Sequence, residues 1–436
     1  MIRTFKYRLH PNAEQAHAFD AWRQQCCDLY NAALEERNSH WQRRRTIERA
    51  VEALGQKLSD DEKKRWKISY ITQCHQLTAL RQEDPFWRGT PALAQRSALR
   101  RVERAFTAFF ARCKRGEKPG HPRFRAKRRY DSFEIGRVSV KKDRVHIPKL
   151  GHVKMNLYRP IGGEIRNAAI HREATGKWWI SFQCNVGDAP AKTPVGAITS
   201  ERMVGIDLGL SELVTLSTGA TIENPRYARG AAAQLARRQR KLASKQKCSK
   251  NRERKRILVA KAHAHVAHQR LDYAHQEAKR LLDRFDVIFY EDLNLRGLCR
   301  GWLSKSFADA AWGIFLRHLI SKAEEAGKHV VPVDARLSSQ LCSACGQLVE
   351  KTLSERIHRC VCGLTLGRDH NAALNVLARG RRALELTVEV GVEREAFVQG
   401  KAQHDMGPGE SSVFLTAATV VEKIECKKID LSDRTR

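Results

Sequence analysis

Three acidic residues of the chain stand where the surrounding sequence favours burial or precise placement. Asp207 ends "MVGID", a short apolar segment typical of a strand, and Glu291 ends "FDVIFYE", an apolar run typical of a strand covered on both faces. Asp369 precedes "HNAALNVLA", whose small and apolar residues suit a helix packed closely on a sheet. Carboxylates that converge from these three positions would form an anionic pocket, which repels phosphate unless divalent cations fill it.

The chemistry that such a pocket could perform is metal-assisted hydrolysis. Magnesium favours carboxylate oxygens and substrate phosphates as ligands. Two magnesium ions about 4 Å apart can activate a water molecule and stabilise the leaving oxygen when a phosphodiester is cleaved. The three acids therefore predict a catalytic magnesium site that acts on a nucleic acid backbone.

Two of these assignments have alternatives that the residues alone leave open. Neighbouring residues of a strand point in opposite directions, so Glu291 or Asp292, but not both, can share a site with Asp207. Asp369 stands where the N-cap of the following helix is expected, and it could serve only as that cap.

Four cysteines predict a second metal site. Cys342 and Cys345 are separated by two residues, and Cys360 and Cys362 by one. Four thiolates make a closed tetrahedral zinc site, whose role is structural because no coordination position stays open. Glycines follow both pairs, where a knuckle turn needs them. The tighter second pair makes His358 an alternative ligand, and four free thiols are the other alternative.

The composition points to a polyanionic partner. Lysine and arginine total 80 against 48 acidic residues, so that the 436-residue chain has a formal net charge of +32. No apolar run of membrane-spanning length occurs, and the first residues, "MIRTFKYRLHPN", lack the apolar core of a signal peptide. We therefore expect a cytoplasmic protein that binds nucleic acid and has no membrane partner.

The elements that must position the candidate residues follow from hydrophobic periodicity. Residues 5–9 alternate between apolar and basic side chains and predict a half-buried strand. Asn12 begins a capping-box signature, and a mostly helical region follows up to about residue 115. Residues 116–199 predict short strands and turns, including a hairpin that turns at Gly176, and "LGLSELVTLST" predicts a hairpin within the sheet of the first acid.

Two basic segments could contact nucleic acid. The first mixes positive charge with the aromatic faces of Phe124 and Tyr130. Its basic residues are Arg123, Arg125, Lys127, Arg128 and Arg129. The second, residues 231–284, lacks glycine and proline and predicts two long helices joined by a polar turn near Ser249. Its candidate contacts are Arg237, Arg238, Arg240, Lys241 and Lys245. The alternatives are a charged sheet edge for the first segment and a solvated helix face for the second.

The order of the motifs "GIDLG", "YEDLN", "SSQLCSACG", "CVCG" and "GRDHNAALN" resembles the TnpB family of transposon-encoded RNA-guided DNA endonucleases, the relatives of the type V CRISPR effectors. The segments "YRLHPNAEQ", "GHPRFRAKRR" and "VHIPKLGHVKM" extend the resemblance over most of the chain. The resemblance implies that Asp207, Glu291 and Asp369 are the catalytic magnesium ligands, and it selects Glu291 over Asp292. It also implies a zinc ribbon on the four cysteines, although "CVCG" departs from the commoner two-residue gap.

The fold that the resemblance implies is a multidomain α+β protein with a helical recognition lobe, a β-barrel-like wedge domain and an RNase H-like RuvC nuclease domain with an inserted zinc ribbon. The expected parts are the first wedge strand at 1–11, the recognition lobe at 12–115, the rest of the wedge at 116–199, the first part of the nuclease at 200–336 with its basic hairpin at 231–284, the zinc ribbon at 337–366, the last part of the nuclease at 367–380, and a flexible tail at 381–436.

The function that follows from the resemblance is RNA-guided, magnesium-dependent cleavage of target DNA next to a short adjacent motif. Its expected partners are a guide RNA and double-stranded target DNA, in the cytoplasm and nucleoid of a prokaryotic cell. Its expected cofactors are two catalytic magnesium ions and one structural zinc ion. The rival interpretations are a nuclease-inactive, RNA-guided repressor, which needs a damaged triad, and a transposase that joins DNA ends.

Overall fold

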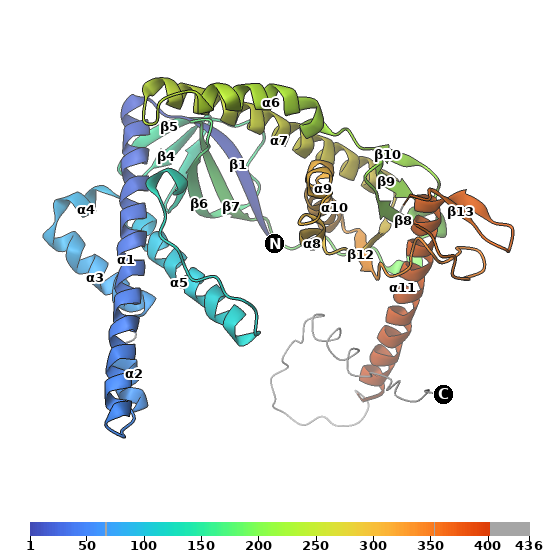
Figure 1. Cartoon of the computed structure of the whole chain (residues 1–436), viewed down its shortest axis with the longest axis horizontal. Coiled ribbons are helices and arrows are strands. Elements are labelled where there is room, and N and C mark those ends of the chain that lie inside the picture. The colour runs from blue at the N-terminus through green and yellow to red at the C-terminus, as the bar shows by residue number, and fades with distance from the viewer. Residues whose placement is uncertain (66–67, 353, 402–436) are drawn as a thin grey trace. The chain divides into compact units, whose positions relative to one another are not determined.

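A computed structural model describes residues 1–65, 68–352 and 354–401 of the chain (Figure 1). The chain divides into two compact units, residues 1–377 and 378–436, and the elements that position the candidate site belong to the first. Among the described residues no helix is both long and apolar enough to cross a membrane.

The first sheet contains the N-terminal strand at its centre. Its seven strands follow the order β2-β6-β7-β1-β5-β4-β3, and all pairs are antiparallel. The strands are β1 (Ile2–His10), β2 (Ser132–Ile135), β3 (Ser139–Lys141), β4 (Arg144–Ile147), β5 (Gly151–Asn156), β6 (Glu164–Arg172) and β7 (Trp178–Asn185). The sheet is curled, and its order starts at β2 and finishes at β3. The expected β region is therefore an antiparallel sheet that curls like a barrel without a closing pair of strands.

Alternation along β1 explains which face of this sheet is covered. Tyr7 and Leu9 are fully buried, whereas Lys6 and Arg8 point to the other face. Helix α1 packs its Phe19 ring 5.1 Å from the ring of Trp178 on β7. The helices of this half are α1 (Ala13–Ala53), α2 (Asp60–Arg65), α3 (Tyr70–Glu83), α4 (Pro85–Gly89) and α5 (Ala92–Lys114). The predicted capping box at Asn12 is confirmed, since Asn12 and Gln15 exchange side-chain to backbone hydrogen bonds.

The second sheet mixes antiparallel and parallel pairs. Its order is β10-β9-β8-β11-β12. The strands are β8 (Met203–Leu208), β9 (Glu212–Leu216), β10 (Thr221–Glu223), β11 (Val287–Glu291) and β12 (His329–Val333). Strands β8, β11 and β12 run parallel, and β9 returns antiparallel to β8, which confirms the hairpin predicted after Asp207. Strand β11 lies between β8 and β12, and its apolar run is buried on both faces.

The helices around the second sheet include the basic hairpin. They are α6 (Tyr227–Ala243), α7 (Lys250–Arg284), α8 (Leu295–Leu298), α9 (Ser304–Ala310), α10 (Trp312–Ala326) and α11 (Arg368–Lys401). Helices α6 and α7 lie side by side, and the Ser249 side chain caps the start of α7 (Figure 1). The C-terminal half of α7 contributes Ala278 and Leu281 to the core, and its first half carries most of the lysines and arginines of the helix.

The remaining elements are short. A two-stranded ribbon of β13 (Ile357–Arg359) and β14 (Thr365–Gly367) precedes α11, and three 3-10 helices cover Lys127–Arg129, Val195–Ala197 and Ser200–Arg202. The basic segment at residues 123–129 lies in a loop and the first of these 3-10 helices. The alternative of a charged sheet edge for this segment is therefore wrong. Most of the expected flexible tail, from residue 402 onward, lies outside the described residues.

Candidate functional site

Two adjacent strand ends bring the first two acids together. Strands β8 and β11 are parallel neighbours whose register pairs Ile206 with Tyr290, so that Asp207 and Glu291 follow at the same edge of the sheet. The side chain of Glu291 is buried, whereas Asp292 is exposed. The structure thus directs Glu291, and not Asp292, into the sheet.

The third acid comes from the start of α11. This helix begins at Arg368, so Asp369 lies within its first turn. The expectation that Asp369 occupies the N-cap is therefore wrong by two residues, because the short strand β14 leads directly into the helix and Gly367 precedes its first residue. A methyl group added at Gly209, in the turn after β8, would lie 4.0 Å from Asp369 Oδ2. The carboxylate of Asp369 therefore faces the strand end that carries Asp207.

The electrostatics show that the three acids act on one another. Loss of water around Asp207, followed by the negative charges of Glu291 and Asp369, raises the pKa of Asp207 well above that of an ordinary aspartate. Arg368 opposes this effect only in part. Among the described residues, the four cysteines form the group of potential metal ligands whose atoms all lie within 4.8 Å of one another. The three carboxylates do not meet this distance. The site is a cluster of three carboxylates, and Arg368 beside Asp369 offsets part of its negative charge.

Two neighbouring side chains hold the carboxylates in place. The buried Ser338 hydroxyl donates a hydrogen bond to Glu291 Oε1. Arg368 Nε donates to Asp369 Oδ1 over 3.3 Å. Neither was singled out in the sequence, although both lie in the motifs "SSQLCSACG" and "GRDHNAALN". A serine before a knuckle and a basic residue before an acid are too common to identify a supporting role without the fold.

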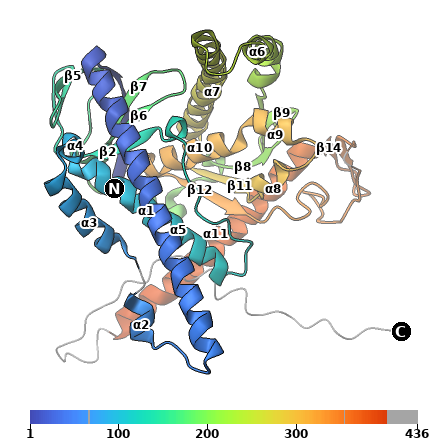
Figure 2. The same ribbon diagram turned by 60° about the vertical axis from the view of Figure 1, so that its left-hand side comes forward.

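Helix α11 can approach β8 closely because β8 contains a glycine. Figure 2 shows the first turns of α11 near β8. A Cβ at Gly205 would lie 2.3 Å from the carbonyl oxygen of Ala373 and 2.5 Å from the amide nitrogen of Leu377, both in the backbone of α11. Gly205 therefore sets the distance between the element that carries Asp207 and the element that carries Asp369.

We predict that Gly205→Ala lowers the stability of the protein, because backbone atoms of α11 must move to admit the methyl group. Overpacking of this kind costs about 1–3 kcal/mol, and occasionally more. Thermal unfolding should show a melting temperature several degrees lower. The control is Gly196→Ala, where nothing lies within 4 Å of the added carbon. Equal melting temperatures for the two variants would contradict this role of Gly205.

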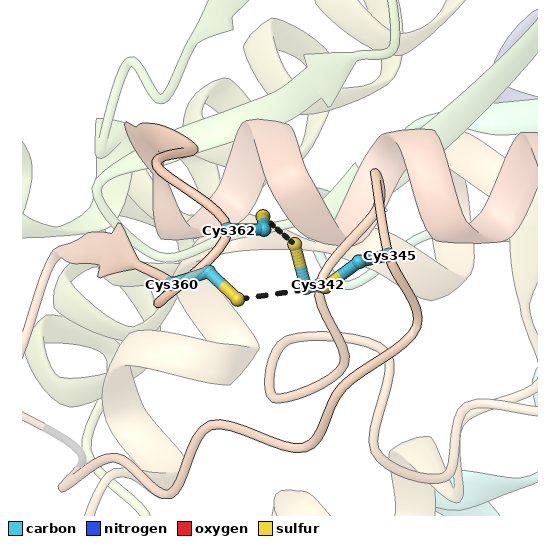
Figure 3. Close-up of side chains that lie close together, drawn as sticks. All are labelled: Cys342, Cys345, Cys360 and Cys362. Carbon is cyan, nitrogen blue, oxygen red and sulfur yellow. Dashed lines mark hydrogen bonds between the residues drawn. The ribbon is translucent and has the colours of Figure 1, made fainter.

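The four cysteines form one cluster (Figure 3). The Sγ atoms of Cys342 and Cys362 are 3.7 Å apart, and those of Cys345 and Cys360 are 3.6 Å apart. Four sulfurs at about 2.3 Å from one tetrahedral zinc ion would be about 3.8 Å from each other. The distances are too long for disulfide bonds, which need about 2.05 Å. The cluster therefore fits one zinc ion, and His358 lies outside the group of four.

The knuckle turns around these cysteines explain the glycines that follow them. Gly346 and Gly363 have positive φ angles of 75° and 92°, and their amides donate to the carbonyls of Cys342 and Cys360. Burial opposes ionisation of Cys342. Hydrogen bonds with the backbone N–H groups of Cys345 and Ala344, and with the side chains of His358 and Cys345, outweigh burial and lower the pKa of this thiol to about 5.

The second pair behaves differently. The backbone N–H of Cys362 lowers the pKa of Cys360, but burial and hydrogen bonds to the neighbouring thiols outweigh it and raise that pKa to about 12. Ionisation of one thiol in the cluster thus makes ionisation of the next less favourable, as expected for ligands that require a cation.

Two asparagines of α11 tie the cluster to the acids. Asn371 Nδ2 donates to the carbonyl of Leu341 over 2.7 Å, and Asn371 Oδ1 accepts from the amide of Ser343 over 3.0 Å. Asn375 Nδ2 donates to the carbonyls of Ser338 and Leu341. The loop that leads into the first knuckle is therefore bound to the helix that presents Asp369. The i, i+4 spacing of these asparagines was the available signal in the sequence, since it places both on one helix face.

The predicted basic contacts lie on the surface. The side chains of Arg123, Arg125, Lys127, Arg128 and Arg129 are exposed. Most of the predicted contacts in the basic hairpin are exposed as well, namely Arg237, Arg240 and Lys241 on α6 and Lys245 in the turn that follows it. Arg238 is half-buried and donates to the carbonyl of Leu258 on α7, so part of its role is to hold the hairpin together.

The chain matches three protein families along its length. Residues 184–300 match a family described as "Probable transposase". Residues 312–376 match the "Cas12f1-like, TNB domain", and residues 1–46 match a "Helix-turn-helix domain". The second of these matches contains the four cysteines and Asp369.

Relatives resemble the chain over nearly its whole length. A protein of Streptomyces pristinaespiralis named "Putative RNA-guided DNA endonuclease" is 30% identical over 93% of this chain and 96% of its own. The "Putative RNA-guided DNA endonuclease InsQ" of Escherichia coli (strain K12) is 26% identical over 88% of this chain and 93% of its own. A solved structure, the "Cryo-EM structure of the Cas12f1-sgRNA-target DNA complex", shares the fold, with a TM-score of 0.52, 14% identity and coverage of 84% and 83% of the two chains. The motifs, their order and this similarity show that the chain belongs to the TnpB family of transposon-encoded RNA-guided DNA endonucleases.

Proposed function

We propose that the protein is an RNA-guided, magnesium-dependent DNA endonuclease that cuts target DNA next to a short adjacent motif. The observation that carries this proposal is the convergence of Asp207, Glu291 and Asp369 at one edge of the second sheet. The order of that sheet, with three parallel strands and an antiparallel hairpin, supports a RuvC-like nuclease domain with an RNase H fold. Catalysis and RNA guidance then belong to one polypeptide.

The donor set at this edge fits magnesium. All three side chains offer carboxylate oxygens, which are the ligands that magnesium prefers. Their mutual repulsion, expressed in the raised pKa of Asp207, would be relieved by bound cations. Magnesium ions in such a site lower the pKa of an attacking water and stabilise the charge on the leaving oxygen.

The residues of the chain would then have distinct tasks. Asp207, Glu291 and Asp369 would hold the metal ions. Ser338, a positioning residue, would fix the orientation of the Glu291 carboxylate through the hydrogen bond that it donates. Arg368 would do the same for Asp369 and limit the repulsion between the acids.

The cysteine cluster would hold one structural zinc ion. Its four sulfurs leave no open coordination position, so the ion would not take part in the reaction. The hydrogen bonds from Asn371 and Asn375 to the loop before the first knuckle suggest its purpose, which is to keep the start of α11 in place. The zinc ribbon at 337–366 would therefore support the position of Asp369.

The remaining parts would bind the nucleic acids. We assign the helices within 12–115 to a recognition lobe, and the sheet formed by 1–11 and 116–199 to a wedge domain that holds guide RNA and target DNA. The solved Cas12f1 structure that shares the fold is a complex with an sgRNA and target DNA, which supports this assignment. In this type of enzyme base pairing reads the sequence, and the protein holds the heteroduplex through its backbone, a task that suits a net charge of +32.

The basic loop provides a test of nucleic acid binding. We predict that replacing Arg123, Arg125, Arg128 and Arg129 with alanine weakens binding and flattens its salt dependence, by a slope of about 0.9 for each lost contact with a duplex phosphate. Because these side chains are exposed, the melting temperature should stay close to that of the unaltered protein. The measurement is binding affinity against salt concentration. A slope equal to that of the unaltered protein would mean that the loop faces only solvent.

The guide itself provides the test of the proposed function. We expect that the protein, purified from cells that also express the DNA flanking its gene, carries one defined RNA whose end matches neighbouring sequence. Sequencing of the co-purified RNA would identify it. Recovery of only a random mixture of cellular RNA would contradict the proposal.

A transposase is the second candidate, because the family matched by residues 184–300 is described as one. The two candidates differ in their products. A transposase would join transposon ends to a new DNA, whereas a nuclease leaves free ends. A strand-transfer assay with labelled transposon ends separates them.

A further inference from the structure

Four basic side chains gather where the helical region meets the first sheet. Arg81 lies on α3, Arg88 on α4, Arg96 on α5, and Lys149 in the turn between β4 and β5. The three arginines, together with Thr78 and Gln82, line a cavity of about 430 Å³. This volume lies within the range of about 300–1,000 Å³ that is usual for sites of small ligands.

Three of these four basic side chains, those of Arg81, Arg88 and Lys149, donate hydrogen bonds to neutral groups. Arg81 Nη1 donates to the carbonyls of Trp87 and Thr90 over 2.7 Å and 3.0 Å. Arg88 Nε donates to the carbonyl of Arg81 over 2.7 Å, and Lys149 donates to the carbonyl of Arg88.

Arg96 differs from the other three, because over the described residues it has no hydrogen-bond or ion-pair partner. In the same part of the chain no carboxylate forms an ion pair with any of the four. Four positive charges therefore stand together without a negative one.

The positive charges affect one another. Burial, followed by the nearby charges of Arg96 and Arg88, lowers the pKa of Arg81. Burial and the charge of Arg81 also lower the pKa of Lys149. An anion bound between these side chains would remove this repulsion.

A second arginine-rich cavity of the protein shows the contrast. It has a volume of about 1200 Å³ and is lined by arginines such as Arg128 and Arg252, but also by Asp131, Glu173 and Glu253. Carboxylates of the protein thus offset part of the positive charge in this lining. Among the described residues, the lining of the smaller cavity contains no carboxylate, so only a bound anion could offset its positive charge.

We propose that the cavity lined by Arg81, Arg88 and Arg96 binds a backbone phosphate of a nucleic acid. Guanidinium groups bind phosphate oxygens through paired hydrogen bonds, and the unpartnered Arg96 keeps all its donors available for them. Arg81 is held in position by the carbonyls that it contacts, so little of its side-chain entropy remains to be lost on binding. This inference rests on the proposed function, because it requires a guide RNA or a target DNA as the source of the phosphate.

The test uses Arg96→Gln, since this arginine has no bond within the protein that the change could break. Arg115→Gln is the matched control, because Arg115 is exposed and paired with Glu117 in the same helical region. One arm measures binding of the guide RNA to RNA-free protein. The other measures binding of a target duplex to protein loaded with RNA. Each arm compares 50 mM with 200 mM salt.

We expect Arg96→Gln to weaken binding in one arm and to reduce the loss of affinity between the two salt concentrations. The reduction should be about 3.5-fold for one contact with a duplex phosphate, and somewhat less for a single strand. The arm that changes identifies the source of the phosphate. Arg115→Gln should behave like the unaltered protein in both arms.

Two outcomes would overturn the inference, and they can be told apart. If the unaltered protein cuts its target but Arg96→Gln and Arg115→Gln have the same salt dependence in both arms, the phosphate site is wrong and the proposed function stands. If the unaltered protein binds neither nucleic acid, both fail. Arg88→Gln provides a second variant, and its effect should follow that of Arg96→Gln.

Discussion

Asp369→Asn is expected to abolish cleavage of both target strands while RNA-guided binding to the target persists. Asparagine keeps the size of the side chain and an oxygen that can accept from Arg368. It loses the negative charge that would hold magnesium. Metal ions contribute several kcal/mol to the stabilisation of the transition state, and about 1.4 kcal/mol corresponds to a factor of ten, so we expect a loss of about a thousandfold or more.

The effect of this substitution on stability should be small. A negative charge in the first turn of a helix contributes about 0.3–1 kcal/mol through the helix dipole, and removal of one of three repelling charges offsets part of this loss. The melting temperature should therefore change little. If Asp369 serves only the start of α11, cleavage by Asp369→Asn would remain near normal.

Matched variants make the assignment specific. Asp207→Asn and Glu291→Gln should behave like Asp369→Asn. Asp292→Asn removes a charge of the same sign from the residue next to Glu291, but this side chain is exposed, and the variant should cut normally. A gel-shift assay beside a cleavage assay on the same RNA-loaded preparation measures both properties. Loss of activity in Asp292→Asn equal to that in Glu291→Gln would overturn the choice between the two acids.

Cys345→Ser is expected to remove zinc and, with it, most of the cleavage activity. Metal binding supplies about 10–16 kcal/mol of folding free energy in small zinc-finger peptides, so the loss of one ligand should unfold the knuckles. Because Asn371 and Asn375 connect the loop before them to α11, the position of Asp369 should loosen as well. The melting temperature should fall.

Elemental analysis measures the zinc directly. The unaltered protein should carry about one ion per chain, and Cys345→Ser none. Cys299→Ser is the control, because this exposed cysteine lies outside the cluster and should keep both zinc and activity. A fully active protein without zinc would contradict the structural role of the cluster.

Local patterns in the sequence were sufficient for much of the fold. The alternation around Tyr7, the capping box at Asn12 and the turn at Gly176 depend on neighbours within a few residues, and each is present in the structure. The hairpin after Asp207 and the two closely spaced cysteine pairs of the cluster also belong to short segments of the sequence. Such features are fixed by backbone preference and side-chain periodicity, which a single sequence displays.

Features that depend on distant partners could not be predicted. The helix α11 begins two residues before the position that an N-cap at Asp369 predicts, because β14 runs into the helix without a break. The need for glycine at position 205 arises from the backbone of α11, more than 160 residues away in the sequence. Asn371 reaches the loop before the knuckle, and Lys149 reaches the carbonyl of Arg88, only once the elements have packed. Periodicity predicts which face of a helix or strand is buried, but it does not predict which other element packs against that face.

Cleavage of a matched target by the RNA-loaded protein tests the central claim most directly. The protein, with the guide RNA that co-purifies with it, is incubated in magnesium with DNA that matches the guide and, separately, with DNA of scrambled sequence. We predict that both strands of the matched DNA are cut, that the scrambled DNA stays intact, and that removal of magnesium with a chelator stops the reaction. Cleavage that does not depend on the match to the guide, or no cleavage of a matched target that the protein binds, would contradict the account.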